Sequence, residues 1–180
     1  MGKTFKELEE KNGRKKDRVE IENLYAWDCS FTTADLDKHE YHKGYLMSGG
    51  KRNNQLSLEE VYAQVREVQN PFFVGKDGFG THAALRIVDP VVRAYCFDVD
   101  KIDPLQLTKE NIKKLLEMDD RAEFIKFMNE LIVTESEAKQ IAYLVDNNML
   151  GLDDMAGCKR DTVRLHVYGI LGIKQYNYYA

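Results

Sequence analysis

The stretch TESEAKQIAYLV, residues 134–145, shows most plainly how the C-terminal half of this chain folds. Thr134 and Glu137 are spaced as in a capping box, in which a hydroxyl and a carboxylate satisfy free backbone N–H groups at a helix start. Ala138 and Ile141 then begin an apolar series at helical spacing. The stretch therefore predicts an amphipathic helix that starts at Thr134.

Two further helices are predicted upstream of this one. Thr108 is a suitable cap for the first, and Asp119 or Asp120 for the second. Downstream, we expect a short turn at 152–156 and a last helix from about Asp161 to Tyr168. The glycines that follow weaken any continuation of this last helix, Gly169 and Gly172.

The N-terminal half shows strand patterns and one clear helix. Residues 19–31 begin with apolar residues alternating with charged ones, which predicts a strand with a buried end. Residues 32–56 are polar and contain glycine, so we expect a loop there. Ser57 and Glu60 form a second capping-box pattern, and the helix that follows is expected to end at Asn70-Pro71.

Residues 72–100 have a composition typical of strands. A short apolar run opens this region, and a glycine-rich turn follows it at 75–80. Residues 81–88 and 91–99 are predicted to pair as a hairpin, with Asp89-Pro90 at the turn.

Together these patterns predict an α+β fold. We expect a small antiparallel sheet in the N-terminal half and a helical C-terminal half with an end that resembles a helix-turn-helix. The expected divisions are a basic arm at 1–18, an α+β domain at 19–102 with its long loop at 32–56, and a helical domain or subdomain at 103–180.

The composition excludes several classes of protein. The chain has 180 residues, with 26 Lys and Arg against 30 Asp and Glu, so its formal net charge is −4. It is not collagen-like, disulfide-dense or compositionally disordered. Because it is acidic overall, any contact with nucleic acid must come from a local basic patch.

The compartment is predicted from cysteines and apolar runs. Cys29, Cys96 and Cys158 are isolated and odd in number, which is typical of reduced thiols in the cytoplasm. No signal peptide is recognisable, and no run approaches the ~20 apolar residues of a membrane span. We expect a cytoplasmic protein without a membrane partner.

The region from Met149 to Leu171 carries the strongest recognition pattern. A helix, a turn containing Gly157 and a second helix are the elements of a helix-turn-helix motif. Val163 and Val167 would pack inward. Three cationic side chains would then point outward, where a DNA groove could meet them: Lys159, Arg160 and Arg164.

Residues Ala156 to Val163, AGCKRDTV, resemble the turn and recognition-helix start of lactose-repressor-type helix-turn-helix proteins. The resemblance covers residues 152–168 and implies nucleic-acid binding. Two positions depart from the family's pattern, since Lys159 stands where a Ser or Thr cap is usual and Asp153 where a small Ala is usual.

Two terminal segments are further candidate contact sites. The basic arm offers cations for phosphate contacts, Arg14, Lys15, Lys16 and Arg18. The aromatic C-terminus suggests a partner interface, because tyrosine is favoured at interfaces. Its residues are Tyr176, Tyr178 and Tyr179.

Metal sites are a less favoured possibility. His39 and His42, with Asp35 nearby, could supply imidazole and carboxylate ligands to a divalent metal. Asp98, Asp100 and Asp103 surround the end of an expected strand, although turns before proline favour Asp in any case. The glycine-rich stretch at 75–80 lacks the ending of a phosphate-binding P-loop and is better explained as a turn.

The resulting hypothesis is a non-enzymatic cytoplasmic accessory or regulatory protein that binds macromolecules. Its C-terminal helix-turn-helix-like element would contact nucleic acid, and no cofactor is expected. The first alternative is a protein–protein interaction module, such as an inhibitor, an assembly factor or a structural component of viral or mobile-element origin. The second is a metal-dependent hydrolase.

Overall fold

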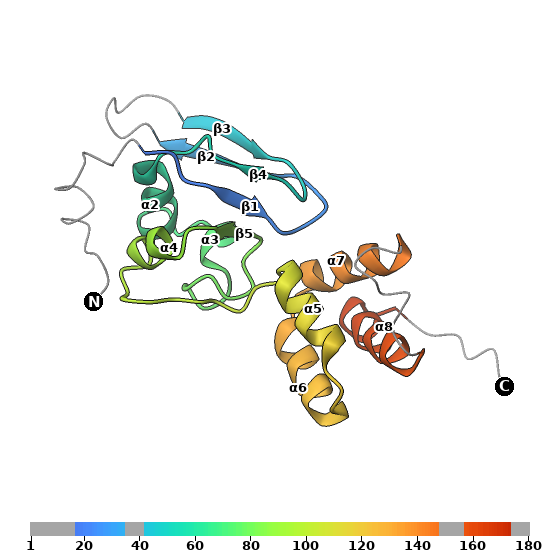
Figure 1. Cartoon of the computed structure of the whole chain (residues 1–180). Helices are drawn as coiled ribbons and strands as arrows, with labels where there is room; N and C mark the ends of the chain where they lie inside the picture. Colours follow the sequence, from blue (N-terminus) through green and yellow to red (C-terminus); the bar gives the residue numbers. More distant parts are fainter. Residues whose placement is uncertain (1–16, 35–41, 148–156, 174–180) are drawn as a thin grey trace. The chain divides into compact units, whose positions relative to one another are not determined.

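The computed structural model describes residues 17–34, 42–147 and 157–173 (Figure 1). The chain forms two compact units, residues 1–106 and 107–180. The predicted α+β class is confirmed, because antiparallel strands occupy the N-terminal half and most of the described helices lie in the C-terminal half. In the described ranges, no helix is both long and apolar enough to cross a membrane.

A three-stranded antiparallel sheet is central to the first unit. Strand β1 lies in the middle and pairs with both neighbours, so that Ile21 faces Asn53 on one side and Ile87 on the other. Ile21 is fully buried. The strands are β1 (Ile21–Asn23), β4 (Arg52–Asn53) and β5 (Leu85–Ile87).

A separate two-stranded hairpin corrects the predicted loop at 32–56. Strand β2 (Cys29–Ala34) pairs with β3 (His42–Met47) in one continuous antiparallel register. Cys29 and Thr33 are buried while the residues between them are exposed or half-buried. The prediction was wrong because a half-exposed strand carries many polar residues, and polarity alone does not distinguish it from a loop.

The described helix that follows β4 confirms a predicted cap. Helix α2 (Leu58–Arg66) begins at a complete capping box, in which the Glu60 N–H donates to Ser57 Oγ at 3.3 Å and the Ser57 N–H donates to Glu60 Oε2 at 2.8 Å. The helix ends at Arg66 rather than at Asn70. Gln69 lies in the left-handed region, with φ 52°, and this conformation separates α2 from the next helix.

The predicted hairpin at 81–99 is wrong, because residues 91–96 belong to a helix. Helix α4 (Pro90–Cys96) begins with a proline, and the Asp89 side chain accepts hydrogen bonds from the N–H groups of Val91 and Val92. Proline is well suited to a first helical position, where its missing N–H has no partner to lose. The short helix α3 (Pro71–Val74) follows the same rule, so the apolar run at 72–74 is helical rather than extended.

Helices α2 and α4 lie side by side on one side of the strands (Figure 1). Their contact includes Tyr62 and Tyr95, whose rings stack with centroids 5.3 Å apart. Cys96 is fully buried, and burial raises the pKa of its thiol to about 12. Cys96 is therefore a core residue on a helix, and its thiol is held in the neutral form.

The second unit is built from helices that the sequence largely predicts. The side chains of Thr108, Asp120 and Thr134 each accept a hydrogen bond from a backbone N–H of the helix that follows, as expected of caps. Glu137 completes the capping box at Thr134 and is fully buried. The described helices are α5 (Lys109–Glu117), α6 (Arg121–Leu131), α7 (Glu135–Asp146) and α8 (Gly157–Leu171).

Helix α8 is longer than predicted. It starts at Gly157, which is therefore its first residue and not part of a preceding turn, and it runs through Gly169. Gly172, with φ 64°, ends it. The Ile173 N–H donates to the Tyr168 carbonyl at 3.0 Å, and the Gly172 N–H to the Gly169 carbonyl at 3.4 Å, as in a Schellman motif. The expected turn at 152–156 lies outside the described residues.

The two glycines at the end of α8 should respond oppositely to alanine. Gly172→Ala forces a side chain into the left-handed region and is expected to lower the free energy of unfolding by about 1 kcal/mol. Gly169→Ala meets no atom within 4 Å and is expected to raise the free energy of unfolding by about 0.5–1 kcal/mol. Urea unfolding followed by circular dichroism measures both, and shifts of the same sign would contradict this account of the helix end.

Candidate functional site

Helix α8 packs on α7 through one apolar face. Val163 and Val167 are each 2% exposed, which confirms their predicted inward position. They line a narrow hollow with Ile141 and Val145 of α7. This packing directs the opposite face of α8 toward solvent, where Leu165 is 55% exposed.

Two arginines follow each other at one-turn spacing on α8. Arg164 is exposed, and its guanidinium carbon lies 5.8 Å from the centre of the Tyr168 ring, where a cation–π contact orients it. Arg160 is half-buried. Neither arginine forms an ion pair with a carboxylate among the described residues. Both guanidinium groups thus keep donors for an external anion.

The predicted outward position of Lys159 is wrong. Its Nζ donates to the Leu116 carbonyl at 3.3 Å and lies 5.9 Å from the centre of the Phe124 ring. Leu116 is in the last turn of α5, where carbonyl groups have no partner within the helix. Lys159 therefore caps α5, and its aliphatic stem covers part of the apolar surface.

A histidine makes the second polar contact that holds α8 in place. The Nε2 atom of His166 lies 2.8 Å from the Ile132 carbonyl oxygen, at the end of α6. Together with Lys159 and the packed valines, this contact holds α8 from two of its sides. The arginines consequently project from a fixed helix, which lowers the entropic cost of binding through them.

Most of the other predicted contact residues lie outside the described ranges. This applies to Arg14, Lys15 and Lys16 of the basic arm and to the terminal Tyr176, Tyr178 and Tyr179. Arg18 is described, is exposed and donates from its guanidinium to the Gln55 carbonyl.

The candidate metal ligands are not brought together in the described part of the chain. Asp35 and His39 lie outside it, and His42 opens β3 with an undescribed side chain. No group of three or more His, Cys, Asp or Glu side chains among the described residues could hold a metal ion.

Two of the three aspartates after Cys96 form ion pairs with arginines. Asp98 lies 3.5 Å from Arg66, and Asp103 lies 3.3 Å from Arg93. They follow a helix and not the expected strand end.

The glycine-rich stretch at 75–80 is a closed turn, in agreement with its interpretation from the sequence. Asp77 Oδ1 accepts hydrogen bonds from the N–H groups of Phe79 at 2.8 Å and Thr81 at 3.2 Å. Although partial burial by itself raises the pKa of Asp77, hydrogen bonds from the Thr81 side chain and from these N–H groups hold that pKa below its usual value. The carboxylate thus uses backbone donors that a bound phosphate would need.

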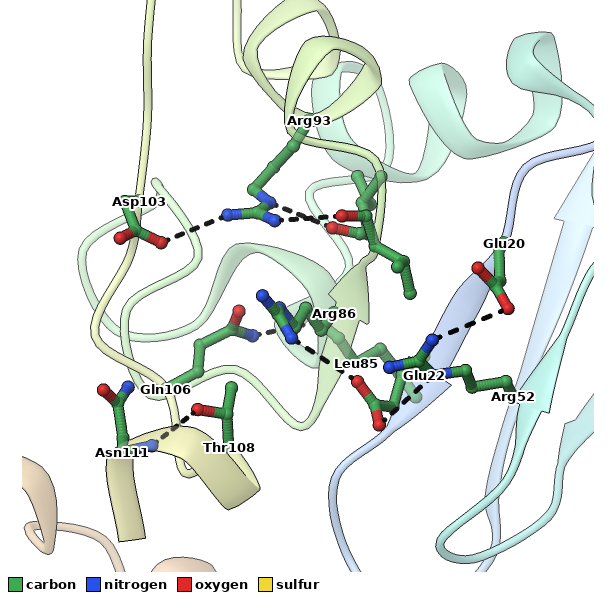
Figure 2. Close-up of polar contacts among 12 residues, drawn as sticks. Glu20, Glu22, Arg52, Leu85, Arg86, Arg93, Asp103, Gln106, Thr108 and Asn111 are labelled. Carbon is green, nitrogen blue, oxygen red and sulfur yellow. Dashed lines mark hydrogen bonds and ion pairs between the residues drawn. The ribbon is translucent and has the colours of Figure 1, made fainter. Parts of the chain in front are cut away.

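The outer edge of the three-stranded sheet is covered by two side chains that sequence analysis missed (Figure 2). Gln106 Nε2 lies 3.1 Å from the Ala83 carbonyl oxygen and 3.2 Å from that of Leu85. Arg93 Nε donates to the Ile87 carbonyl at 2.9 Å. These donors satisfy alternate carbonyls that a further strand would otherwise pair with. Gln106 and Arg93 are 2% and 4% exposed.

Beside this edge lies a pocket of about 480 Å³. It is formed by β5, α4 and residues 100–103, and its wall includes Arg86, Arg93 and Lys101. The only sequence signal for it is a pair of arginines flanking Asp89-Pro90. That signal becomes informative only when residues 90–96 are known to be helical.

Comparisons of the chain with protein-family models, curated proteins and solved structures give no match.

Proposed function

We propose that the second unit binds nucleic acid through the outward side of α8, with Arg160 and Arg164 contacting phosphate groups. The observation that carries this proposal is the pair of arginines one turn apart, unpaired with carboxylates in the described residues. They lie on a helix held in place by its apolar face, with Arg164 at the edge of that packing. In this proposal the protein is a non-enzymatic accessory or regulatory factor.

The dimensions and chemistry of α8 suit this role. A helix fits into the major groove of duplex DNA, which is about 12 Å wide, and residues near its N-terminal half make the contacts. Arg160 and Arg164 lie in that half of α8. A guanidinium group binds phosphate through two parallel hydrogen bonds, which gives an oriented contact.

The charge of this surface is local rather than general. Asp161 is exposed between the two arginines in sequence and partly offsets their charge. Binding through two oriented guanidinium groups, rather than through a broad positive field, is therefore what we expect. The basic arm at 1–18 would add phosphate contacts that do not depend on base sequence.

A double substitution tests the proposal. Arg160→Ala with Arg164→Ala is expected to weaken binding to a mixed-sequence DNA duplex by about tenfold to a hundredfold at low salt, because two phosphate contacts are lost. Fluorescence anisotropy with a labelled duplex measures the dissociation constant. Single-stranded DNA and RNA of equal length are measured in parallel.

The matched control is Lys113→Ala with Lys139→Ala. Both lysines are exposed in the second unit, and each already pairs with a glutamate one turn away, Glu117 and Glu135. This control makes the same change in net charge. Equal weakening by the two double variants would show a nonspecific charge effect and contradict the proposed surface.

A protein partner is a second candidate, favoured by one observation. Leu165 is 55% exposed on the outward side of α8, next to Arg164, and such an apolar side chain is a common anchor at protein interfaces. Binding that survives high salt and is lost on Leu165→Ser would favour this candidate. Binding that is lost at high salt and unaffected by Leu165→Ser would favour nucleic acid.

A further inference from the structure

The pocket beside β5 contains a buried cation, Arg93, whose two nearby carboxylates, Asp103 and Asp89, are exposed to solvent. The Arg93 side chain is 5% exposed, but its carboxylate partner Asp103 is 86% exposed at 3.3 Å. A carboxylate so well solvated compensates a buried charge weakly. The carbonyls of Ile87, Val88 and Ile102 satisfy N–H groups of Arg93 without supplying negative charge.

A second guanidinium group lies in the same pocket. Arg86 projects from β5 toward the same region as Arg93 (Figure 2) and lines the same pocket. Burial and the nearby Arg86 charge lower the pKa of Arg93, and Asp103 and Asp89 only partly offset this effect, which indicates like-charge repulsion between the two arginines. Arg86 also lies 3.6 Å from Glu22, which it shares with Arg52. An anion between Arg86 and Arg93 would reduce this repulsion.

The rest of the pocket wall is partly apolar and partly acidic, because Asp100 lines it together with Asp103. Pro90, Val91 and Ala94 from α4 line it, and Val91 is 45% exposed to solvent. Its volume of about 480 Å³ lies within the range of small-molecule sites, about 300–1,000 Å³. The combination of fixed cations with an apolar wall suits a ligand that has an anionic head and a compact apolar body.

We propose that this pocket binds a small organic oxyanion, a carboxylate or phosphate, between the guanidinium groups of Arg86 and Arg93. Lys101 adds a further cation at the pocket wall, and the apolar body of the ligand lies on Pro90, Val91 and Ala94. Asp103 competes with the ligand for Arg93 and is displaced from it. The site is separate from the proposed nucleic-acid surface and does not depend on it.

Calorimetric titration of the full chain at constant ionic strength tests this site. The probes are inorganic phosphate, acetate and benzoate, with chloride as the reference anion. Comparison of phosphate with acetate identifies the preferred head group, and comparison of acetate with benzoate tests the apolar wall. We expect saturable binding of at least one oxyanion, and benzoate at least about tenfold tighter than acetate.

Two opposite substitutions sharpen the test. Arg86→Gln is expected to weaken binding of the tighter probe by about tenfold or more. Asp103→Asn is expected to strengthen it several-fold, since a competing carboxylate is removed. The exposed ion pair supplies matched controls, Arg66→Gln and Asp98→Asn, which should leave binding unchanged. Lys101→Gln, on an exposed residue, replaces Arg86→Gln if that variant fails to fold.

Each outcome decides the proposal. Weaker oxyanion binding by the Arg86→Gln variant, together with tighter binding by the Asp103→Asn variant, supports the proposal. The proposal would be overturned if no oxyanion bound saturably. It would also be overturned if the control variants changed binding as much as the pocket variants do, or if chloride bound as tightly as the oxyanions. Equal binding of acetate and benzoate would overturn the assignment of an apolar body.

Discussion

Arg93→Met is expected to lower the free energy of unfolding by about 3–5 kcal/mol, because it leaves buried polar groups without partners. Arg93 Nε donates to the Ile87 carbonyl at 2.9 Å, and its other nitrogens contact the Val88 carbonyl at 3.3 Å and Asp103 at 3.3 Å. Methionine fills a similar volume and supplies no donor. Urea unfolding monitored by circular dichroism gives the change in free energy.

Arg66→Met is the matched control for this prediction. Arg66 is 42% exposed and forms one ion pair, with Asp98, so its replacement is expected to cost less than about 1 kcal/mol. If the Arg93 and Arg66 variants were equally stable, the contacts of Arg93 with the sheet edge would not contribute to stability as we describe.

Glu137→Ala is expected to destabilise the second unit by about 2–3 kcal/mol. Glu137 is fully buried, and its Oε2 accepts hydrogen bonds from the N–H groups of Val133 at 2.8 Å and Thr134 at 2.9 Å. Alanine leaves both N–H donors without this acceptor. It also creates a cavity where the carboxylate was. Thermal unfolding followed by circular dichroism detects the loss.

The equivalent substitution in the other capping box is Glu60→Ala. Glu60 is half-buried, and water can reach the N–H that it leaves, so the expected cost is about 1 kcal/mol. A larger loss of stability from Glu60→Ala than from Glu137→Ala would mean that burial does not set the strength of these caps.

The helical unit could be predicted because its signals are local. Thr108, Asp120 and Thr134 each accept a hydrogen bond from a backbone N–H within the following three residues. Such a cap needs no information about the tertiary structure. The inward position of Val163 and Val167 follows equally from helical spacing.

The first unit was harder to predict because competing local preferences were decided by tertiary contacts. Val91 and Val92 favour a strand by propensity, yet Asp89 caps a helix that begins at Pro90. Arg93 donates to a β5 carbonyl 6 residues away in the sequence, and Gln106 donates to carbonyls on and just before β5 that are 21 and 23 residues away. No spacing rule connects such residues before the fold is known.

The candidate surface on α8 was predicted in part. The sequence identified Lys159, Arg160 and Arg164 as neighbours on one helix, and the described structure leaves Arg164 exposed and Arg160 half-buried. The sequence could not show that the Lys159 side chain contacts the last turn of α5, because the two residues in contact are 43 positions apart. The proposed anion pocket was not predicted, since β5, α4 and residues 100–103 form it only in the folded unit.

The salt dependence of nucleic-acid binding tests whether Arg160 and Arg164 contact phosphate groups. Anisotropy titrations of the unmodified chain and of the Arg160→Ala, Arg164→Ala variant are repeated at several salt concentrations. A plot of log association constant against log salt concentration should be steep for the unmodified chain and shallower by about 2 for the variant, one unit for each lost phosphate contact. Identical slopes, or no binding of duplex DNA, single-stranded DNA or RNA at low salt, would contradict the assignment of α8 as a nucleic-acid surface.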